Sequence, residues 1–395
     1  MTRDPTAQRV WLVIALVLAL LAFIILPLEQ PEGRSSFVAQ LPPDVEAPTG
    51  ALAEVYDLAR PATLRIEVRS REQFFRSFVR GLGTGFFISP DGYILTAYHV
   101  VEGANEEGSL VGVGPNDDRY PLELVGFDAY LDLALLRTDV RGSVPFVPLA
   151  DRAPRIGDRV VAIGNSRGDF LAARAGRVTA LGVEASRADF ASGTIELTAA
   201  LAPGDSGGPV LNEASKVVGV VSYISFMGDG GLPGDNFIPP FLRGLGLGSG
   251  FASYAVPVEL NSAVVAALQS GVRRDVPVIG FSWQLDYDPR NTDIDLGANA
   301  GPVVFRVQPG GPADRAGLRS LDERLVRNDL GQVVGRDVQA DVILSVDGER
   351  TRSFNRLLAV VRSKEIGQRV TLEVQRGSET VRLELELGAK AQVFE

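Results

Sequence analysis

The chain has 395 residues, of which 45% are hydrophobic and 22% charged, with a formal net charge of −10. This composition is typical of a globular protein long enough for two or three domains. An acidic chain without a basic cluster gives no support for a nucleic-acid partner. The absence of cysteine excludes disulfides and a cysteine nucleophile. With His99 as the only histidine, a conventional multi-histidine metal site is excluded, and we expect neither a metal nor a cofactor.

An uncharged, apolar stretch occupies positions 10–28, after a short segment (1–9) that contains two arginines. About 19 residues at a rise of ~1.5 Å would span roughly 28 Å, close to the ~30 Å hydrocarbon core of a bilayer. Arginines before the stretch and glutamates after it predict a single-pass transmembrane anchor with a cytoplasmic N-terminus. Two alternatives stay open. One is a cleaved signal peptide, although no A-x-A-like site follows, and the other is a buried helix of a soluble domain.

Positions 29–50 are rich in proline, glutamate, serine and glutamine and lack periodicity, which predicts a linker. A short helix is predicted at 51–59, ending near Pro61. From Ala62 to about Val258, short apolar segments alternate with turn residues, a pattern typical of an all-β barrel or sandwich. The clearest of these patterns predicts a hairpin over 85–96, with Pro90-Asp91-Gly92 at its turn. Further strands are predicted at 122–125, 133–137, 159–163, 176–181, 194–198, 217–221 and 252–256, and a helix at 258–268.

A second unit, at positions 277–390, mixes predicted strands and helices, which suits one small α+β domain. Its strands are predicted at 303–307, 342–346 and 370–375, and its helices at 312–318 and 353–361.

The segment 224–250, between a strand predicted to end at Tyr223 and one predicted to begin near Phe251, is rich in glycine but carries several large apolar side chains. Loops of this length are usually functional or disordered, and disordered tracts seldom hold so many apolar groups. We expect this loop either to gate a binding cleft or to pack against a neighbouring subunit.

Three residues that suit peptide hydrolysis occur in the order His, Asp, Ser, which is that of chymotrypsin-like proteases. This chemistry needs a nucleophile, a base, a group that orients the base, and donors for the oxyanion. Ser206, in the hexapeptide GDSGGP (204–209), would be the nucleophile. His99 is the only imidazole base, and Asp132 would orient it. The backbone N–H groups of Gly204 and Ser206 can converge on the oxyanion, helped by the conformational freedom of glycine.

Six segments around these residues carry a family pattern: GTGFFI (83–88), DGYILT (91–96), HVV (99–101), DLALL (132–136), IGN (163–165) and GDSGGP (204–209). They resemble HtrA-type (DegP/DegS-like) serine proteases. The resemblance covers about positions 51–390. It implies a chymotrypsin-like double β-barrel at 51–270, two six-stranded barrels with the triad in the cleft between them, and a homotrimer.

Two positions depart from the family pattern. Asp205 stands where the family commonly has Asn, and the sequence does not show which group pairs with its carboxylate. The sequence Thr198-Ala199-Ala200 lacks the acidic residue that often precedes the two alanines. Ala200 lies six residues before Ser206, where a chymotrypsin-like fold would place the floor of the primary specificity pocket. An uncharged floor predicts cleavage after Val, Ala, Ile or Leu.

The C-terminal unit resembles a PDZ domain in the segments VIGF (278–281), GPADRAGL (311–318) and DVILSVDG (341–348). Ile279, Gly280 and Phe281 would then form the turn whose backbone N–H groups receive a peptide C-terminus. The alternative interpretation of so short a motif is that it is the start of an ordinary strand. Positions 319–340 are an insertion relative to the family.

These features predict a membrane-anchored, ATP-independent serine endopeptidase with its catalytic domain on the periplasmic side of a bacterial inner membrane. Its expected substrates are unfolded, membrane-associated or regulatory proteins, in envelope quality control or stress signalling. A proteolytically silent PDZ adaptor or chaperone is the main alternative. A serine esterase is a third possibility, but such enzymes combine Gly-x-Ser-x-Gly with a downstream histidine, and no histidine follows Ser206.

Overall fold

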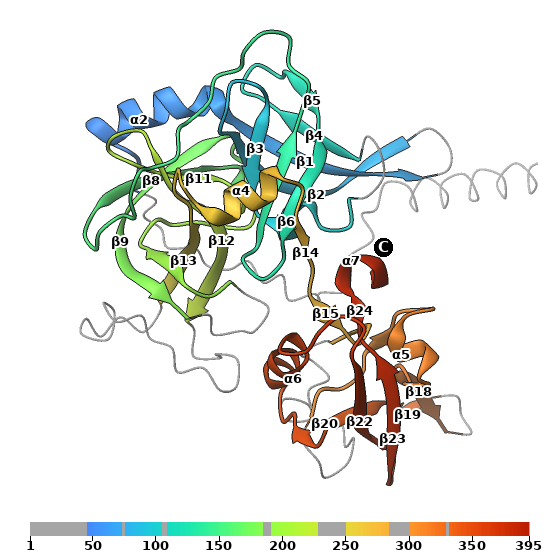
Figure 1. Ribbon diagram of the computed structural model, residues 1–395. Coiled ribbons are helices and arrows are strands. Elements are labelled where there is room, and N and C mark those ends of the chain that lie inside the picture. The colour runs from blue at the N-terminus through green and yellow to red at the C-terminus, as the bar shows by residue number, and fades with distance from the viewer. Residues whose placement is uncertain are drawn as a thin grey trace, which may run out of the picture. The chain divides into compact units, whose positions relative to one another are not determined.

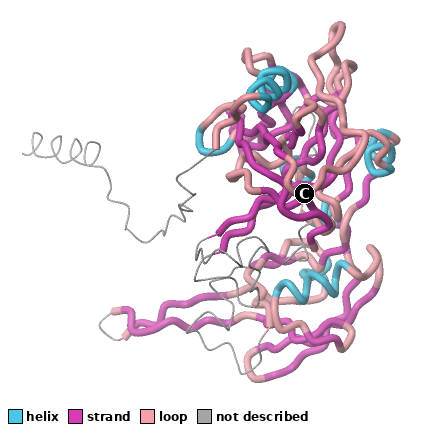
Figure 2. Tube along the Cα trace, turned by 90° about the vertical axis from the view of Figure 1, so that its left-hand side faces the viewer, coloured by secondary structure: helices cyan, strands magenta, loops and turns pink. Residues whose placement is uncertain are grey.

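The computed structural model describes residues 46–72, 76–104, 109–184, 191–227, 250–283, 301–328 and 332–394 (Figure 1). The predicted anchor at 10–28 and nearly all of the predicted linker lie outside these residues. Within them, no helix is long and apolar enough to cross a membrane. Strands are the commonest regular element of the described chain, and the helices are short (Figure 2).

The first sheet follows helix α2 (Ala51–Ala59), which begins and ends as predicted and buries Leu52 and Val55. Eight strands pair in the order β14-β6-β7-β3-β2-β1-β4-β5, whereas the family resemblance implies a six-stranded barrel. One of the two strands beyond six is β14, which comes from a distant segment and pairs in parallel with the edge of β6. The strands are β1 (Thr63–Glu72), β2 (Arg76–Phe87), β3 (Tyr93–Thr96), β4 (Leu110–Val113), β5 (Arg119–Pro121), β6 (Glu123–Asp128), β7 (Leu133–Arg137) and β14 (Arg273–Arg274).

Both faces of this sheet are buried, in two different clusters. Phe86 and Leu95 lie opposite each other in the predicted β2–β3 hairpin and pack into the cluster that includes Ile163 of the next barrel. Their neighbours Phe87 and Ile94 point the other way and pack in a separate cluster. Because successive side chains of a strand alternate between faces, the continuous apolar runs of the sequence supply both clusters.

The second sheet is a closed six-stranded barrel, with strands in the order β10-β13-β12-β11-β8-β9, as the resemblance implies. Strand β12 runs to Met227, which pairs with Gly250, so the predicted strand end at Tyr223 was wrong. The remainder of the predicted loop, 228–249, lies outside the described residues. The strands are β8 (Arg159–Gly164), β9 (Ala172–Val183), β10 (Thr194–Leu197), β11 (Pro209–Asn212), β12 (Val217–Met227) and β13 (Gly250–Pro257).

Helix α4 (Ala263–Gln269) is shorter than the predicted helix at 258–268. It begins after a turn in which the Ser262 N–H donates to the Glu259 carbonyl. Val265 and Leu268 are buried, whereas Leu260 is 57% exposed because it precedes the helix.

The C-terminal domain is α+β, as predicted. Its main sheet has the order β21-β20-β22-β23, and α6 packs on it through Leu357, Val360 and Val361. The predicted strand at 303–307 is reduced to two residues of β17, with Val303 in an isolated bridge. The insertion at 319–340 forms the hairpin β18–β19. The elements are β15 (Pro277–Val278), β16 (Phe281–Ser282), β17 (Arg306–Val307), α5 (Pro312–Arg315), β18 (Asp322–Arg327), β19 (Val333–Gln339), β20 (Asp341–Val346), β21 (Glu349–Arg350), α6 (Phe354–Arg362), β22 (Arg369–Arg376), β23 (Glu379–Glu386), β24 (Gly388–Ala389) and α7 (Lys390–Val393).

Candidate active site

His99 and Asp132 are brought together by the pairing of β3 with β7. His99 follows β3 in the short helix α3 (Tyr98–Val101), and Asp132 immediately precedes β7. Asp132 Oδ2 lies 2.8 Å from His99 Nδ1, and Oδ1 accepts a 2.9 Å hydrogen bond from the His99 backbone N–H. Because a carboxylate can only accept, the Nδ1 atom carries the proton and Nε2 is left as the basic atom. The φ of Asp132 is 54°, in the left-handed region that Asp tolerates better than most residues.

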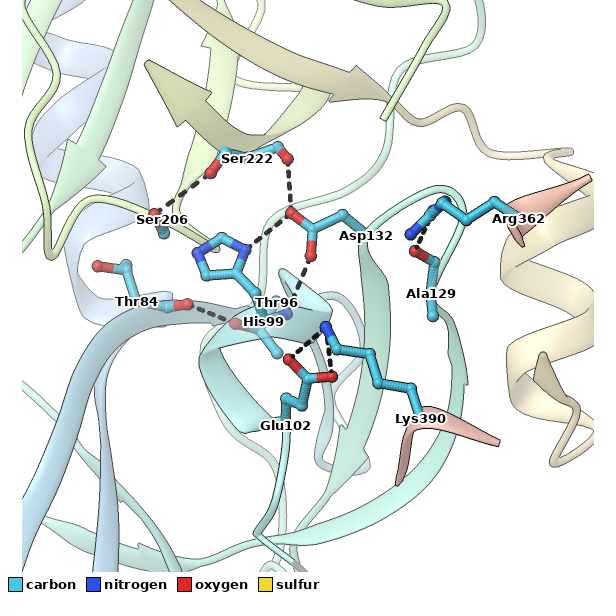
Figure 3. A network of polar contacts seen from close by, with 10 residues as sticks. All are labelled: Thr84, Thr96, His99, Glu102, Ala129, Asp132, Ser206, Ser222, Arg362 and Lys390. Carbon is cyan, nitrogen blue, oxygen red and sulfur yellow. Dashed lines mark hydrogen bonds and ion pairs between the residues drawn. The ribbon is translucent and has the colours of Figure 1, made fainter. Parts of the chain in front are cut away.

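Ser206 lies in the turn before β11, close to His99 and Asp132 (Figure 3). Its Oγ donates a 3.3 Å hydrogen bond to the Ser222 carbonyl, and the Ser222 hydroxyl donates a 2.5 Å bond to Asp132 Oδ2. No hydrogen bond joins Ser206 to His99 in the part of the chain that the structure describes. Bonds of this kind are often long or poorly aligned without substrate. For Ser206 to act as the predicted nucleophile, its hydroxyl would have to rotate from Ser222 toward the ring.

The turn before Ser206 exposes two backbone donors. The φ of Gly204 is +105°, and a Cβ there would lie 2.7 Å from the Asn165 carbonyl oxygen, so the position requires glycine. The Gly204 carbonyl accepts bonds from Thr84 Oγ1 at 2.7 Å and from the Asn165 N–H at 3.3 Å. Among the described residues, neither the Gly204 nor the Ser206 N–H donates a hydrogen bond. Both are therefore available to a developing oxyanion.

The pKa of His99 is raised above its usual value. Burial of the ring lowers this pKa, but the hydrogen bond and the charge of Asp132 raise it, and the charge of Glu102 adds to the rise. Lys390 opposes the rise and pairs with Glu102 at 2.8 Å (Figure 3). The His99 side chain remains 45% exposed, so its proton can exchange with solvent and substrate.

A cavity of about 470 Å³ lies over these residues, and His99, Asp132, Ser206 and Tyr223 are part of its wall. Ala200 is buried, with 5% exposure, and is not among the residues that line this cavity. Its assignment to the floor of a specificity pocket stays a prediction.

The predicted carboxylate-binding turn joins β15 to β16. The φ of Gly280 is +93°, and a Cβ there would lie 3.0 Å from Val393 Cγ1. Ile279 and Phe281 are both buried. The carbonyls of Ile279 and Gly280 accept hydrogen bonds of 2.9 and 3.0 Å, which fix the turn in place.

Comparison with known proteins places the chain in a family. Residues 83–220 match the family model of a trypsin-like peptidase domain, and residues 277–387 match that of a PDZ domain. HhoA of Synechocystis sp., named as a serine protease, is 30% identical over 335 residues, which cover 79% of this chain and 74% of HhoA. The chain belongs to the HtrA family of serine proteases. It is accordingly a serine endopeptidase.

Two further proteins are similar to this chain. Protease Do-like 1 from the chloroplast of Arabidopsis thaliana is 27% identical over 371 residues, 91% of this chain and 76% of that protein. Among solved structures, the HtrA-type protease AlgW with a decapeptide aligns with 87% of this chain and 99% of its own. The identity is 24% and the TM-score 0.46.

Three polar side chains of the site were not predicted from the sequence: Thr84, Asn165 and Ser222. Asn165 Nδ2 donates a 2.9 Å bond to Thr84 Oγ1, which in turn binds the Gly204 carbonyl. Thr84 and Asn165 lie in the segments GTGFFI and IGN, so the family pattern was the available signal. Ser222 lies near the end of a predicted strand and in no motif, so nothing in the sequence marked it.

Proposed function

We propose that Ser206, His99 and Asp132 hydrolyse peptide bonds through an acyl-enzyme. His99 Nε2 accepts the hydroxyl proton as Ser206 Oγ bonds to the substrate carbonyl carbon, and the N–H groups of Gly204 and Ser206 bind the oxyanion. His99 then gives that proton to the leaving amine as the C–N bond breaks. Water then bonds to the acyl carbon while His99 Nε2 accepts its proton. His99 returns that proton to Ser206 Oγ as the acyl–oxygen bond breaks. The 2.8 Å contact of Asp132 with His99, beside Ser206, is the observation that most supports this role.

We also propose that the enzyme is anchored by residues 10–28 and works in the periplasm. The charge pattern around that stretch supports the anchor. Relatives from Marinomonas sp. and Pseudomonas fluorescens are named as DegP-like periplasmic serine endoproteases, and this chain covers 57% and 66% of their lengths. Unfolded or regulatory envelope proteins are the proposed substrates, in quality control or stress signalling. The match to the PDZ model supports recognition of peptide C-termini by Ile279, Gly280 and Phe281, and the proposed assembly is a homotrimer.

A fluorophosphonate probe tests the nucleophile directly, because it reacts only with an activated serine. We expect the full chain to be labelled and to cleave an unfolded protein such as casein without ATP. Ser206→Ala should abolish both, whereas Ser270→Ala, on the exposed end of α4, should change neither. Labelling of Ser206→Ala at the parent rate would place the nucleophile elsewhere. A folded parent that neither reacts nor cleaves would favour the PDZ adaptor.

A further inference from the structure

Asp205, the residue before the proposed nucleophile, is 1% exposed. Its Oδ1 accepts a 3.0 Å hydrogen bond from the Ser166 backbone N–H, and its Oδ2 accepts a 3.0 Å bond from the Ala202 N–H. Its carboxylate thus joins two segments: the chain just after β8 and the turn that carries Ser206. A Cβ at Gly164 would lie 2.2 Å from Asp205 Oδ1, so the carboxylate is packed directly against the end of β8.

A buried carboxylate is costly unless a cation or several donors compensate its charge. Burial raises the pKa of Asp205, while hydrogen bonds from Ser166 and Ala202 and the positive charge of Arg174 lower it. Arg174 is the cation whose charge lowers the pKa of this carboxyl.

Arg174 lies on β9, which pairs with β8, and it is 4% exposed. Its Nη2 donates to the Ser166 hydroxyl at 3.4 Å and to Asp169 Oδ2 at 2.8 Å, and its Nη1 donates to the Ala173 carbonyl. The Nε atom is buried and has no hydrogen-bond partner. Asp169 is 53% exposed, so solvent weakens its hold on this charge. A buried, incompletely paired guanidinium therefore stands one hydroxyl group away from a buried carboxylate.

We propose that Arg174 is a positioning residue that serves as the charge partner of Asp205 through the Ser166 hydroxyl and holds the Ser206 turn in its oxyanion-binding shape. The Ser166 hydroxyl accepts from Arg174 at 3.4 Å and the Ser166 backbone N–H donates to the carboxylate at 3.0 Å, so Ser166 links the two charged groups. This role rests on the proposed function of Ser206. Arg174 is then the group that compensates the charge of Asp205, at a position where the family commonly has Asn.

The same end of β8 fixes the oxyanion donors. The Asn165 N–H binds the Gly204 carbonyl, and the neighbouring Ser166 N–H binds Asp205. A shift of the Asp205 carboxylate would therefore turn the peptide units on both sides of it, and with them the N–H groups of Gly204 and Ser206. Such a shift changes transition-state stabilisation more than substrate binding, so kcat should respond more than KM.

The test is a double-mutant cycle of Arg174→Met and Asp205→Asn, assayed for kcat, KM and fluorophosphonate labelling. We expect Arg174→Met to lower kcat about tenfold in the parent, within the range seen for residues of one network. In the Asp205→Asn background it should lower kcat much less, because no buried charge is left to compensate. Arg177→Met, an exposed arginine on the same strand, should leave kcat unchanged.

Equal losses of kcat in the two backgrounds would overturn the proposal, since Arg174 would then act through Asp169 or through β9 alone. If Arg174→Met does not fold, Ser166→Ala, which removes only the bridging hydroxyl, gives the same comparison. Ser206→Ala separately tests the assignment of the nucleophile. Activity in that variant would overturn the nucleophile assignment whatever the cycle shows.

The pH profile distinguishes charge pairing by Arg174 from a purely structural role, which would leave the profile unchanged. The described charged groups at this carboxyl are Arg174 and, beyond it, Asp169. In Arg174→Met the Asp205 carboxyl should protonate at a higher pH, so a second ionisation should appear in the acid limb of kcat/KM. That ionisation should be absent from the double variant and from Arg174→Lys, which keeps the charge. An acid limb of Arg174→Met identical to that of the parent would contradict the charge pairing.

Discussion

The pKa of His99 depends on Glu102, at the end of its own helix, as well as on Asp132. The imidazolium cannot accept a proton, so kcat/KM should fall as the pH drops through the His99 pKa, at a midpoint above the usual ~6.5. Glu102→Gln removes one of the charges that raise this pKa, so the acid limb should move to lower pH. Because His99 is the only histidine, its NMR titration can be compared directly with the rate profile.

Glu213→Gln is the matched control, since Glu213 is an exposed carboxylate paired with Arg159 on the second barrel. It should leave the profile in place. A midpoint that rises in Glu102→Gln, or an NMR pKa that disagrees with the kinetic one, would contradict the assignment of the acid limb to His99.

Ser222 contacts both ends of the proposed triad through its hydroxyl and its carbonyl. Ser222→Ala keeps the carbonyl and removes the hydrogen bond to Asp132. Bonds to charged groups contribute about 1.5–3 kcal/mol, so we expect kcat to fall by about tenfold or more. The pKa of His99 should also rise, because more of the Asp132 charge then acts on the ring. Parent kinetics in a folded Ser222→Ala would show that Asp132 is held without this bond.

The sequence could predict the residues of the site that carry one chemical role in a recognisable motif. The structure brings together His99, Asp132 and Ser206, whose order and surroundings pointed to one reaction. Ser222 and Arg174 could not be predicted, because they reach the site only through the pairing of β12 with β11 and of β9 with β8. An isolated serine or arginine on a strand carries no signal of such a contact.

Elements with a strong apolar pattern were predictable, and elements created by pairing were not. Helix α2 follows its periodic apolar positions, and β22 follows its alternation. The two residues of β14, by contrast, are exposed arginines without a strand pattern. They form a strand because the Phe127 and Ala129 N–H groups bond to the carbonyls of Val272 and Arg274. In the same way, β12 continues past Tyr223 because β13 lies opposite it.

The turn between β15 and β16 should bind peptides by their free C-terminal carboxylate. Amidation removes the anion that the backbone N–H groups would receive, so we expect at least tenfold weaker binding of the amide in a titration with an apolar C-terminal peptide. Gly280→Ala should weaken the binding of the acid form, because the new Cβ meets Val393 at 3.0 Å and the φ of +93° disfavours alanine.

Gly310→Ala is the matched control, since Gly310 also has a positive φ, +71°, but no atom lies within 4 Å of its Cβ position. Gly310→Ala introduces backbone strain of the same kind, but its new Cβ makes no contact at the turn between β15 and β16. Equal affinity of the acid and amide forms, or equal losses in the two variants, would place peptide binding on another surface.

At the scale of the whole molecule, the apolar stretch at 10–28 should decide where the enzyme works. A retained helix of about 19 apolar residues is held firmly in a bilayer, so the full chain expressed in bacteria should sediment with membranes and resist extraction at alkaline pH. Removing residues 1–45 should release a soluble enzyme with unchanged kcat on a short peptide, because the predicted anchor lies within them and the predicted protease domain begins at position 51.

The competing signal-peptide interpretation makes a different prediction for the same cells. Cleavage would give a shorter chain in the soluble periplasmic fraction, which N-terminal sequencing and mass measurement would reveal. Replacing Leu18 and Leu21 by Arg provides the matched control, because charges in the middle of the stretch oppose insertion of the helix. An intact full-length chain that stays soluble would contradict both the anchor and the signal peptide. A digest of spheroplasts then tests the orientation, since only a periplasmic protease domain is open to added protease.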